Sequence, residues 1–271
     1  LFQARVYRGE KNHGPAYGRN FLLNKARGEY VHFHDSDDWF AESWARRIRR
    51  VLISSPCDAV FTEVSSYKDN KLVSREVVGL KEIDSAEKLL PFCIERFMLV
   101  PTGTYKRTLV QKIGGYREDL WQSEDFDFHV RLANAGLKYE LILEPLVFIR
   151  LRAESRSQNR SEAFGDAVKS LQLLSQEIPA QYHKSLAQKA SKLGSSLFDL
   201  GKRSQAREAF RLAKRLGPAT FEHRPSYYQK IASRWGQEMA EWVALFYRTL
   251  IPESFRKNIQ NKPMTLLERS H

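Results

Sequence analysis

Hydrophobic residues follow two different periods along this chain, and the period changes near residue 150. Before that point apolar and polar residues alternate, or β-branched residues run together, which predicts β-strands over residues 28–34, 57–67 and 71–79. Residues 138–151 also favour extended structure, and Pro145 in their middle predicts two strands with a hinge. Helical segments alternate with these stretches, so the first half predicts an α/β domain with a central sheet.

The second half is helical throughout. Apolar residues recur there at intervals of three and four, which is the spacing of one helix face. The predicted stripes are Phe164, Val168, Leu171 and Leu174; Leu186, Ala190, Leu193 and Leu197; and Ala206, Ala209, Phe210 and Ala213. Residues 192–218 resemble one tetratricopeptide-like hairpin with Gly201 at its turn, and residues 225–252 predict a last helix rich in aromatic residues. One repeat is too few for an independent solenoid, so these helices are expected to pack on each other or on the first domain.

Charge divides the chain at the same place. Residues 1–149 hold 22 Lys and Arg against 21 Asp and Glu, whereas residues 150–271 hold 22 against 11. The polar stretch 152–161 lacks apolar periodicity and predicts a linker, which gives an α/β domain over 1–155 and a basic helical region over 156–271. Two cysteines give neither a disulfide framework nor metal-ligand spacing, and no secretory or membrane-spanning pattern is present.

An acidic turn follows the first predicted strand directly. Asp35, Ser36, Asp37 and Asp38 crowd three carboxylates together, and such repulsion calls for a cation, hydrogen-bond donors or solvent. Chemistry in α/β domains gathers beyond the carboxyl ends of strands, and carboxylate oxygens suit Mg²⁺ or Mn²⁺. A solvated turn in which Asp38 caps the next helix explains the same residues, so both interpretations stay open.

A set of short motifs accompanies this turn. They read NHG, RN, ARGEY, DSDD, GGY and ED, in this order, at residues 12–14, 19–20, 26–30, 35–38, 114–116 and 124–125. This ordered set, over roughly residues 5–157, resembles the family 2 glycosyltransferases of the GT-A fold. The resemblance implies a Rossmann-like nucleotide-diphospho-sugar transferase domain followed by an all-α C-terminal region.

The resemblance also implies a role for particular residues. Asp35 and Asp37, with Asp38 as a neighbour, would hold Mn²⁺ or Mg²⁺ and the donor's ribose-diphosphate. The Arg19–Asn20 pair would border the donor nucleotide. Asp125 would be the general base, with Glu124 the next candidate, although acidic residues in a first helical turn are also favoured by the helix dipole alone.

The sequence departs from the family pattern at two places. A family histidine that completes some metal sites is replaced by Arg152, so Arg150 and Arg152 are instead expected to meet the diphosphate. The family's first strand lies before residue 1 or is missing, and the chain begins without Met. Trp121 is a candidate to stack on an acceptor sugar or to fill the core, and His32 and His34 are expected to pack rather than to bind metal.

These observations favour a metal-dependent, inverting transfer of a sugar from a nucleotide-sugar donor to a saccharide or lipid-linked acceptor. The family resemblance implies bacterial cell-surface polysaccharide synthesis in the cytoplasm, and the basic, aromatic C-terminal region favours contact with an anionic membrane surface. No nucleic-acid motif accompanies the basic charge, so no nucleic-acid partner is expected. The alternatives are a non-catalytic scaffold derived from such a domain and a glycosidase that uses Asp37 and Asp125 as its carboxylate pair.

Overall fold

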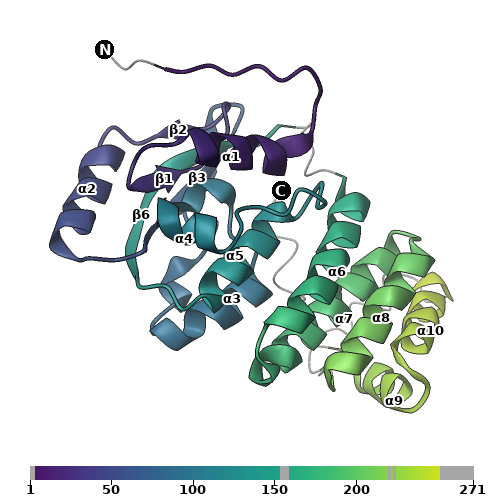
Figure 1. Cartoon of the computed structure of the whole chain (residues 1–271). Helices are drawn as coiled ribbons and strands as arrows, with labels where there is room; N and C mark the ends of the chain where they lie inside the picture. Colours follow the sequence, from purple (N-terminus) through teal and green to yellow (C-terminus); the bar gives the residue numbers. More distant parts are fainter. Residues whose placement is uncertain (1–3, 153–158, 219–220, 222–223, 251–271) are drawn as a thin grey trace.

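The computed structural model describes residues 4–152, 159–218, 221 and 224–250. Figure 1 shows a sheet with helices on both faces, followed by an array of helices that packs against one side of it. The proposed boundary between residues 155 and 156 lies outside the described residues.

The sheet is mixed and has the strand order β1–β5–β3–β6–β2, with β4 paired to β3. β3 and β6 are parallel, and the other pairs are antiparallel. The strands are β1 Tyr30–His32, β2 Trp39–Phe40, β3 Ala59–Lys68, β4 Lys71–Ser74, β5 Gly103–Lys106 and β6 Tyr139–Arg150.

The predicted pair of strands around Pro145 is one strand, so that expectation was wrong. β6 runs through Pro145 beside β3, and the register between the two strands shifts where Glu63 lies opposite the proline. Proline lacks the N–H that a ladder needs, and the shift accommodates it without ending the strand.

Helices cover both faces of the sheet. α2 (Trp44–Ser54) packs Ile48 against Val60 and Ile142 on one face. Ala59 and Phe61, which alternate with Val60 along β3, belong to the main core on the other face. The other helices of this part are α1 Gly14–Lys25, α3 Leu89–Glu95, α4 Arg107–Lys112 and α5 Glu124–Asn134, with short 3₁₀ turns at Leu80–Glu82, Ala86–Lys88 and Val100–Thr102.

The helical region has the predicted stripes, and their residues are buried or, for Phe164, partly buried. Gly201, with a φ of 76°, makes the left-handed turn between α7 (His183–Asp199) and α8 (Arg203–Leu216) that was predicted for a hairpin. The single last helix that was expected is two helices, because Gly236, with a φ of 89°, breaks it. The helices are α6 Arg160–Glu177, α7 His183–Asp199, α8 Arg203–Leu216, α9 Ser226–Trp235 and α10 Gln237–Leu250, with a 3₁₀ turn at Ala180–Tyr182.

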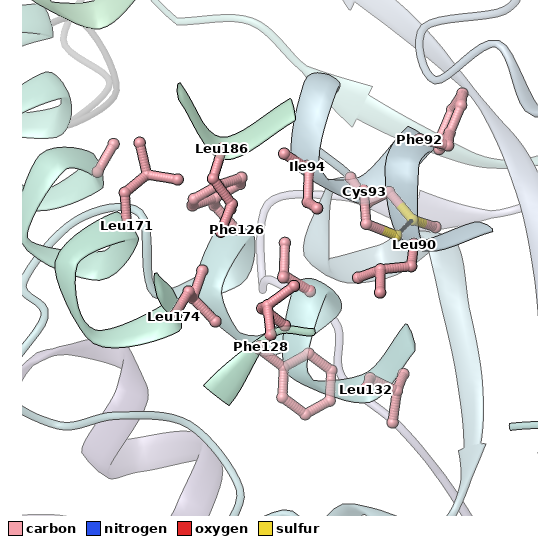
Figure 2. Close-up of a cluster of buried hydrophobic side chains, with 14 of the residues drawn as sticks. Leu90, Phe92, Cys93, Ile94, Phe126, Phe128, Leu132, Leu171, Leu174 and Leu186 are labelled. Atoms are coloured by element: carbon pink, nitrogen blue, oxygen red, sulfur yellow. Dashed lines mark hydrogen bonds between the residues drawn. The ribbon is translucent and has the colours of Figure 1, made fainter. Parts of the chain in front are cut away.

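One hydrophobic core joins the two parts, as expected for helices that cannot form a solenoid alone. Figure 2 shows side chains from α3 and α5 meeting side chains from α6 and α7 in this core. Lys189 of α7 also donates a hydrogen bond of 2.9 Å to the Glu95 carbonyl at the end of α3. Within the described ranges, no helix is both long and apolar enough to cross a membrane.

Candidate functional site

The acidic turn closes just after β1. The Asp38 amide donates to the Asp35 carbonyl at 3.2 Å, and the chain then enters β2 beside β6. The Asp38 carboxylate accepts a hydrogen bond of 3.0 Å from the Arg150 amide. Asp38 therefore joins the turn to β6 and does not cap α2, whose N-cap is Ser43. Burial raises the pKa of Asp38 to about 6, and the charges of Asp37 and Asp35 act in the same direction.

Two arginines, one at the end of β6 and one just after it, lie beside this turn. The Arg152 Nε lies 3.4 Å from Asp37 Oδ2, and both side chains are partly exposed. The Arg150 guanidinium lies 5.5 Å from the centre of the Trp39 ring. The Arg152 side chain is thus next to the predicted metal ligand Asp37, and the Arg150 side chain lies over Trp39, directly after the turn, so both can present positive charge to an anion there.

Arg19 connects the acidic turn to the start of α5. Its Nη2 lies 3.1 Å from Asp35 Oδ1, and its Nη1 lies 2.6 Å from Glu124 Oε1. The guanidinium lies 5.2 Å from the centre of the buried Tyr116 ring. Because Asp35 and Glu124 are far apart in sequence, this one buried side chain brings the two predicted groups of carboxylates together. Burial alone would lower the pKa of Arg19, but Tyr116, Asp35 and Glu124 raise it above its usual range.

Asn20, the other half of the pair, is engaged by the protein. Its side-chain amide donates to the Tyr116 carbonyl and its oxygen accepts from the Tyr116 amide, both at 2.8 Å. It also donates to Glu118 at 2.9 Å. Its oxygen lies 2.4 Å from where a Cβ on Gly115 would stand, so the GGY motif must carry glycine there. Asn20 therefore anchors the GGY turn, whose Tyr116 ring lies against Arg19, and its predicted contact with the donor stays a prediction.

Asp125 lies in the first turn of α5. Its carboxylate accepts a hydrogen bond of 2.8 Å from the Phe126 amide, and its carbonyl oxygen lies 2.7 Å from His129 Nδ1. Burial raises the pKa of Asp125 to about 7, the charge of Glu124 adds to the rise, and the Phe126 hydrogen bond and Arg19 oppose it. A carboxylate with a pKa near neutrality is suited to accept a proton at physiological pH.

The loop before α5 is held by the helical region. The Gln122 amide donates to Asp166 Oδ2 at 2.6 Å, and its side chain donates to Glu162 Oε2 at 2.8 Å. Ser123 has a left-handed φ of 60°, and its hydroxyl donates to the Ala163 carbonyl at 2.9 Å. Ser123 is the N-cap residue of α5, but its hydroxyl bonds to α6 and makes no cap hydrogen bond to α5.

Trp121 is partly exposed and lies beside this loop. Its ring is 3.0 Å from where a Cβ on Gly14 would stand, and Gly14 also has a φ of +84°. Glycine is therefore required at the start of α1 for backbone and for space. Trp121 is too exposed to be a core residue, and one side of its ring packs against Gly14. Its stacking on an acceptor sugar stays a prediction.

The histidines near the turn pack, as expected. The His34 ring stacks on Phe40 with centroids 3.9 Å apart, and the His32 ring lies edge-on to Trp44. Burial lowers the pKa of both, that of His32 to about 3. In the described ranges no three His, Cys, Asp or Glu side chains gather as a metal site.

The donor set nevertheless fits a divalent ion that is shared with a substrate. Mg²⁺ is commonly held by one or two carboxylates, with water and substrate phosphates as its other ligands. Asp35 and Asp37 supply two hard oxygen donors at the surface of the turn, whereas Asp38 is held by the β6 backbone. Sequence reasoning missed the bridge through Arg19 and the support from α6, since neither leaves a local signal.

The comparisons with known proteins concern the same part of the chain. Residues 1–114 match the family model described as glycosyl transferase family 2. An uncharacterized glycosyltransferase of Haemophilus influenzae is 26% identical over 141 residues, which are 48% of this chain and 45% of that protein. An uncharacterized glycosyltransferase of Methanocaldococcus jannaschii is 26% identical over 146 residues, covering 53% and 49%. The chain spans about half the length of the curated relatives it matches.

Solved structures share its fold. The structure of S. aureus TarS residues 1–349 in complex with UDP-GlcNAc superposes with a TM-score of 0.65 at 17% identity, over 90% of this chain and 75% of that one. Another crystal structure of S. aureus TarS residues 1–349 superposes with a TM-score of 0.62 at 18% identity, over 89% of this chain and 73% of that one. The sheet therefore has the GT-A fold and is followed by a helical region. Through its N-terminal α/β part, this chain is similar to glycosyl transferase family 2 and to glycosyltransferases of two organisms.

Proposed function

We propose that this chain transfers a sugar from a nucleotide-sugar donor to an acceptor hydroxyl, with inversion at the anomeric carbon. The observation that carries the proposal is the Arg19 bridge, which puts the acidic turn and the Glu124–Asp125 pair at one site. Such a transfer needs one group to neutralise a departing diphosphate and another to take the acceptor's proton. At one end of the bridge the acidic turn would hold a metal ion on the diphosphate, and at the other end Asp125, next to Glu124, would take the proton.

In this mechanism Asp125 is the general base. Its carboxylate takes the proton of the acceptor hydroxyl while the acceptor oxygen bonds to the anomeric carbon and the bond to the diphosphate oxygen breaks. The pKa of about 7 allows Asp125 to be unprotonated before the step and protonated after it. Glu124 is bound to Arg19, so it is a weaker candidate for the base and a stronger one for positioning.

Asp35 and Asp37 would hold Mg²⁺ or Mn²⁺ on the donor diphosphate. When bound, such an ion would offset negative charge on the leaving group. Arg152, beside Asp37, and Arg150, beside Trp39, would add a guanidinium that suits phosphate oxygens. Because Arg19 donates to two carboxylates, we propose that it positions Asp35 rather than contacting the donor base itself.

The donor and acceptor are proposed by class. S. aureus TarS has been crystallised with UDP-GlcNAc, and the shared fold supports a nucleoside diphosphate sugar for this chain as well. Trp121 beside the start of α1 would stack on an acceptor sugar, which is either free or linked to a lipid. Synthesis of a bacterial surface polysaccharide in the cytoplasm is consistent with such substrates.

The test is donor binding and turnover by the purified full chain. Calorimetry with UDP-, GDP- and dTDP-sugars, in Mn²⁺, Mg²⁺ or a chelator, should detect one donor that binds only with a metal. Asp37→Ala should weaken that binding by roughly tenfold or more. Glu87→Ala, an exposed carboxylate distant in sequence from the turn, is the matched control and should leave it unchanged.

One observation favours a second candidate, a non-catalytic scaffold. Asp35 and Asp37 are each paired with an arginine, so the turn is already charge-balanced within the protein. A scaffold would bind no nucleotide sugar in any of these buffers, and that outcome would replace our proposal. Hydrolysis of a glycoside without nucleotide or metal would instead identify a glycosidase.

A further inference from the structure

The last helix exposes an apolar face. Met239, Trp242, Phe246 and Leu250 follow one another at intervals of three, four and four residues, so they lie on one side of α10. Trp235, the last residue of α9, is exposed as well, and we call these five residues the aromatic stripe. Trp235 is 66% exposed, Phe246 65% and Leu250 63%. The opposite side of α10 carries Ala240 and Ala244, which are buried against α9.

A basic ridge lies alongside the stripe. α8 carries five Lys and Arg against one Glu, at Arg203, Arg207, Arg211, Lys214, Arg215 and Glu208. The Arg203 guanidinium lies 4.8 Å from the centre of the Trp242 ring. Arg207 forms a bidentate ion pair with Glu238 of α10, with distances of 2.9 and 2.7 Å. These contacts fix the ridge next to the stripe at the outer side of the helical array, where Figure 1 shows α8 and α10 together.

Neither feature is explained by packing within the described part of the chain. Isolated apolar residues are common on protein surfaces, but a contiguous set on one helix face marks an interaction surface. The Glu238 carboxylate is paired with Arg207, and the Glu241 carboxylate on the inner side of α10 is buried and accepts hydrogen bonds from Tyr228 at 2.6 Å and Arg224 at 3.0 Å. The exposed surface therefore combines apolar side chains with an excess of positive charge.

We propose that the aromatic stripe and the basic ridge dock this protein on an anionic lipid bilayer. The helix α10 lies in the plane of the interface, with Phe246, Leu250 and the tryptophans among the headgroups and upper acyl chains. Arg211, Lys214 and Arg215 lie over anionic headgroups, to which cations near the surface are attracted. The charge complementarity of the ridge selects a bilayer over a neutral apolar partner. This inference stands independently of the proposed transferase reaction, since lipid binding needs neither donor nor metal.

The test measures partitioning of the full chain onto vesicles by co-sedimentation, without donor. Vesicles of phosphatidylcholine that contain phosphatidylglycerol should bind the protein, and phosphatidylcholine alone should bind it far less. Binding should weaken as salt rises, because screening shortens the reach of the charges. Tryptophan emission should shift to shorter wavelength on binding, which reports transfer of an indole out of water.

Two pairs of variants separate the apolar and charged contributions. Phe246→Gln with Leu250→Gln should lower partitioning by roughly tenfold or more, whereas Ile53→Gln on α2, where the side chain is 72% exposed, should not. Arg211→Gln should lower it about fivefold at low salt, whereas Arg46→Gln, the same charge change on α2, should have little effect. Circular dichroism of each variant checks that the helices remain.

Three outcomes would overturn the proposal. The first is equal binding to neutral and anionic vesicles, and the second is no binding to either. The third is a wild-type dimer, seen by light scattering, that Phe246→Gln with Leu250→Gln converts to a monomer while vesicle binding is absent. That third result would make the stripe an interface between two copies of the chain.

Discussion

Replacing Arg19 by glutamine is expected to destabilise the fold strongly, because it leaves a buried carboxylate without its partner. The side chains of Arg19 and Glu124 are only 10% and 7% exposed, and they meet at 2.6 Å. Removing one partner of a buried ion pair typically costs about 3–5 kcal/mol. The accompanying loss of the Asp35 contact adds little, about 1 kcal/mol or less, because that carboxylate is half exposed.

A double-mutant cycle isolates this pair. Arg19→Gln with Glu124→Gln restores a neutral pair that can still hydrogen-bond, so the double variant should recover most of the loss seen in Arg19→Gln. Urea unfolding followed by circular dichroism gives the free energies, and each kcal/mol should shift the melting temperature by about 2–4 °C in a chain of this size. Additive losses, or a cost of Arg19→Gln below about 1 kcal/mol, would refute the buried bridge.

The same cycle has a pH dependence with a defined sign. Burial and the charge of Glu124 raise the pKa of Asp125 and Arg19 opposes the rise, so without Arg19 this pKa should rise further and the folded state should bind more protons than the unfolded one. Stability then falls as pH rises through this raised pKa, and the deficit of Arg19→Gln should be larger at pH 8 than at pH 5. A deficit that does not change with pH would mean that lost packing, not the unpaired charge, causes it.

Three further predictions concern the base, its support and the helical hairpin. If Asp125 is the base, kcat/KM should rise with pH through about 7. Asp125→Asn should remove this rise and lower turnover by roughly a hundredfold to ten-thousandfold, while donor affinity changes little. A parallel loss of donor binding would assign Asp125 to the nucleotide site or to the fold. Asp166→Asn weakens the hydrogen bond that holds the loop before α5 on α6. It should lower kcat several-fold more than it changes the donor Kd measured by calorimetry. An unchanged kcat would show that the loop keeps its shape without α6. Gly194→Ala should lower the free energy of unfolding in urea by about 1–3 kcal/mol, because the new Cβ would stand 2.3 Å from the Phe210 ring. The control Gly18→Ala, with open space around it in α1, should be neutral or stabilising by about 0.5–1 kcal/mol. Equal effects at both sites would contradict the close α7–α8 contact.

Much of the fold followed from local pattern. The strand before the acidic turn, the helix that begins at Glu124 and the three apolar stripes of the helical region all lie where periodicity predicts them. A strand or helix exposes its period directly in the sequence, because neighbouring side chains alternate or repeat by geometry alone. The exceptions are the places where a helix or strand ends or continues against the local pattern. Gly236 ends a helix inside a continuous amphipathic pattern, and Pro145 stays within one strand because a shift in register absorbs it.

Only the tertiary structure decided which distant residues act together. Arg19 joins carboxylates that lie 16 and 105 residues away, and Asp166 holds an amide 44 residues before it. Periodicity likewise could not tell the outward stripe of α10 from the inward stripe of α7, since both helices are amphipathic. An interaction between side chains depends on where the backbone brings them, and loop closure over such separations leaves no mark on the neighbouring sequence. The sequence therefore determined the elements and the kinds of chemistry each carries, while the packing of those elements determined which charges meet and which apolar face stays in solvent.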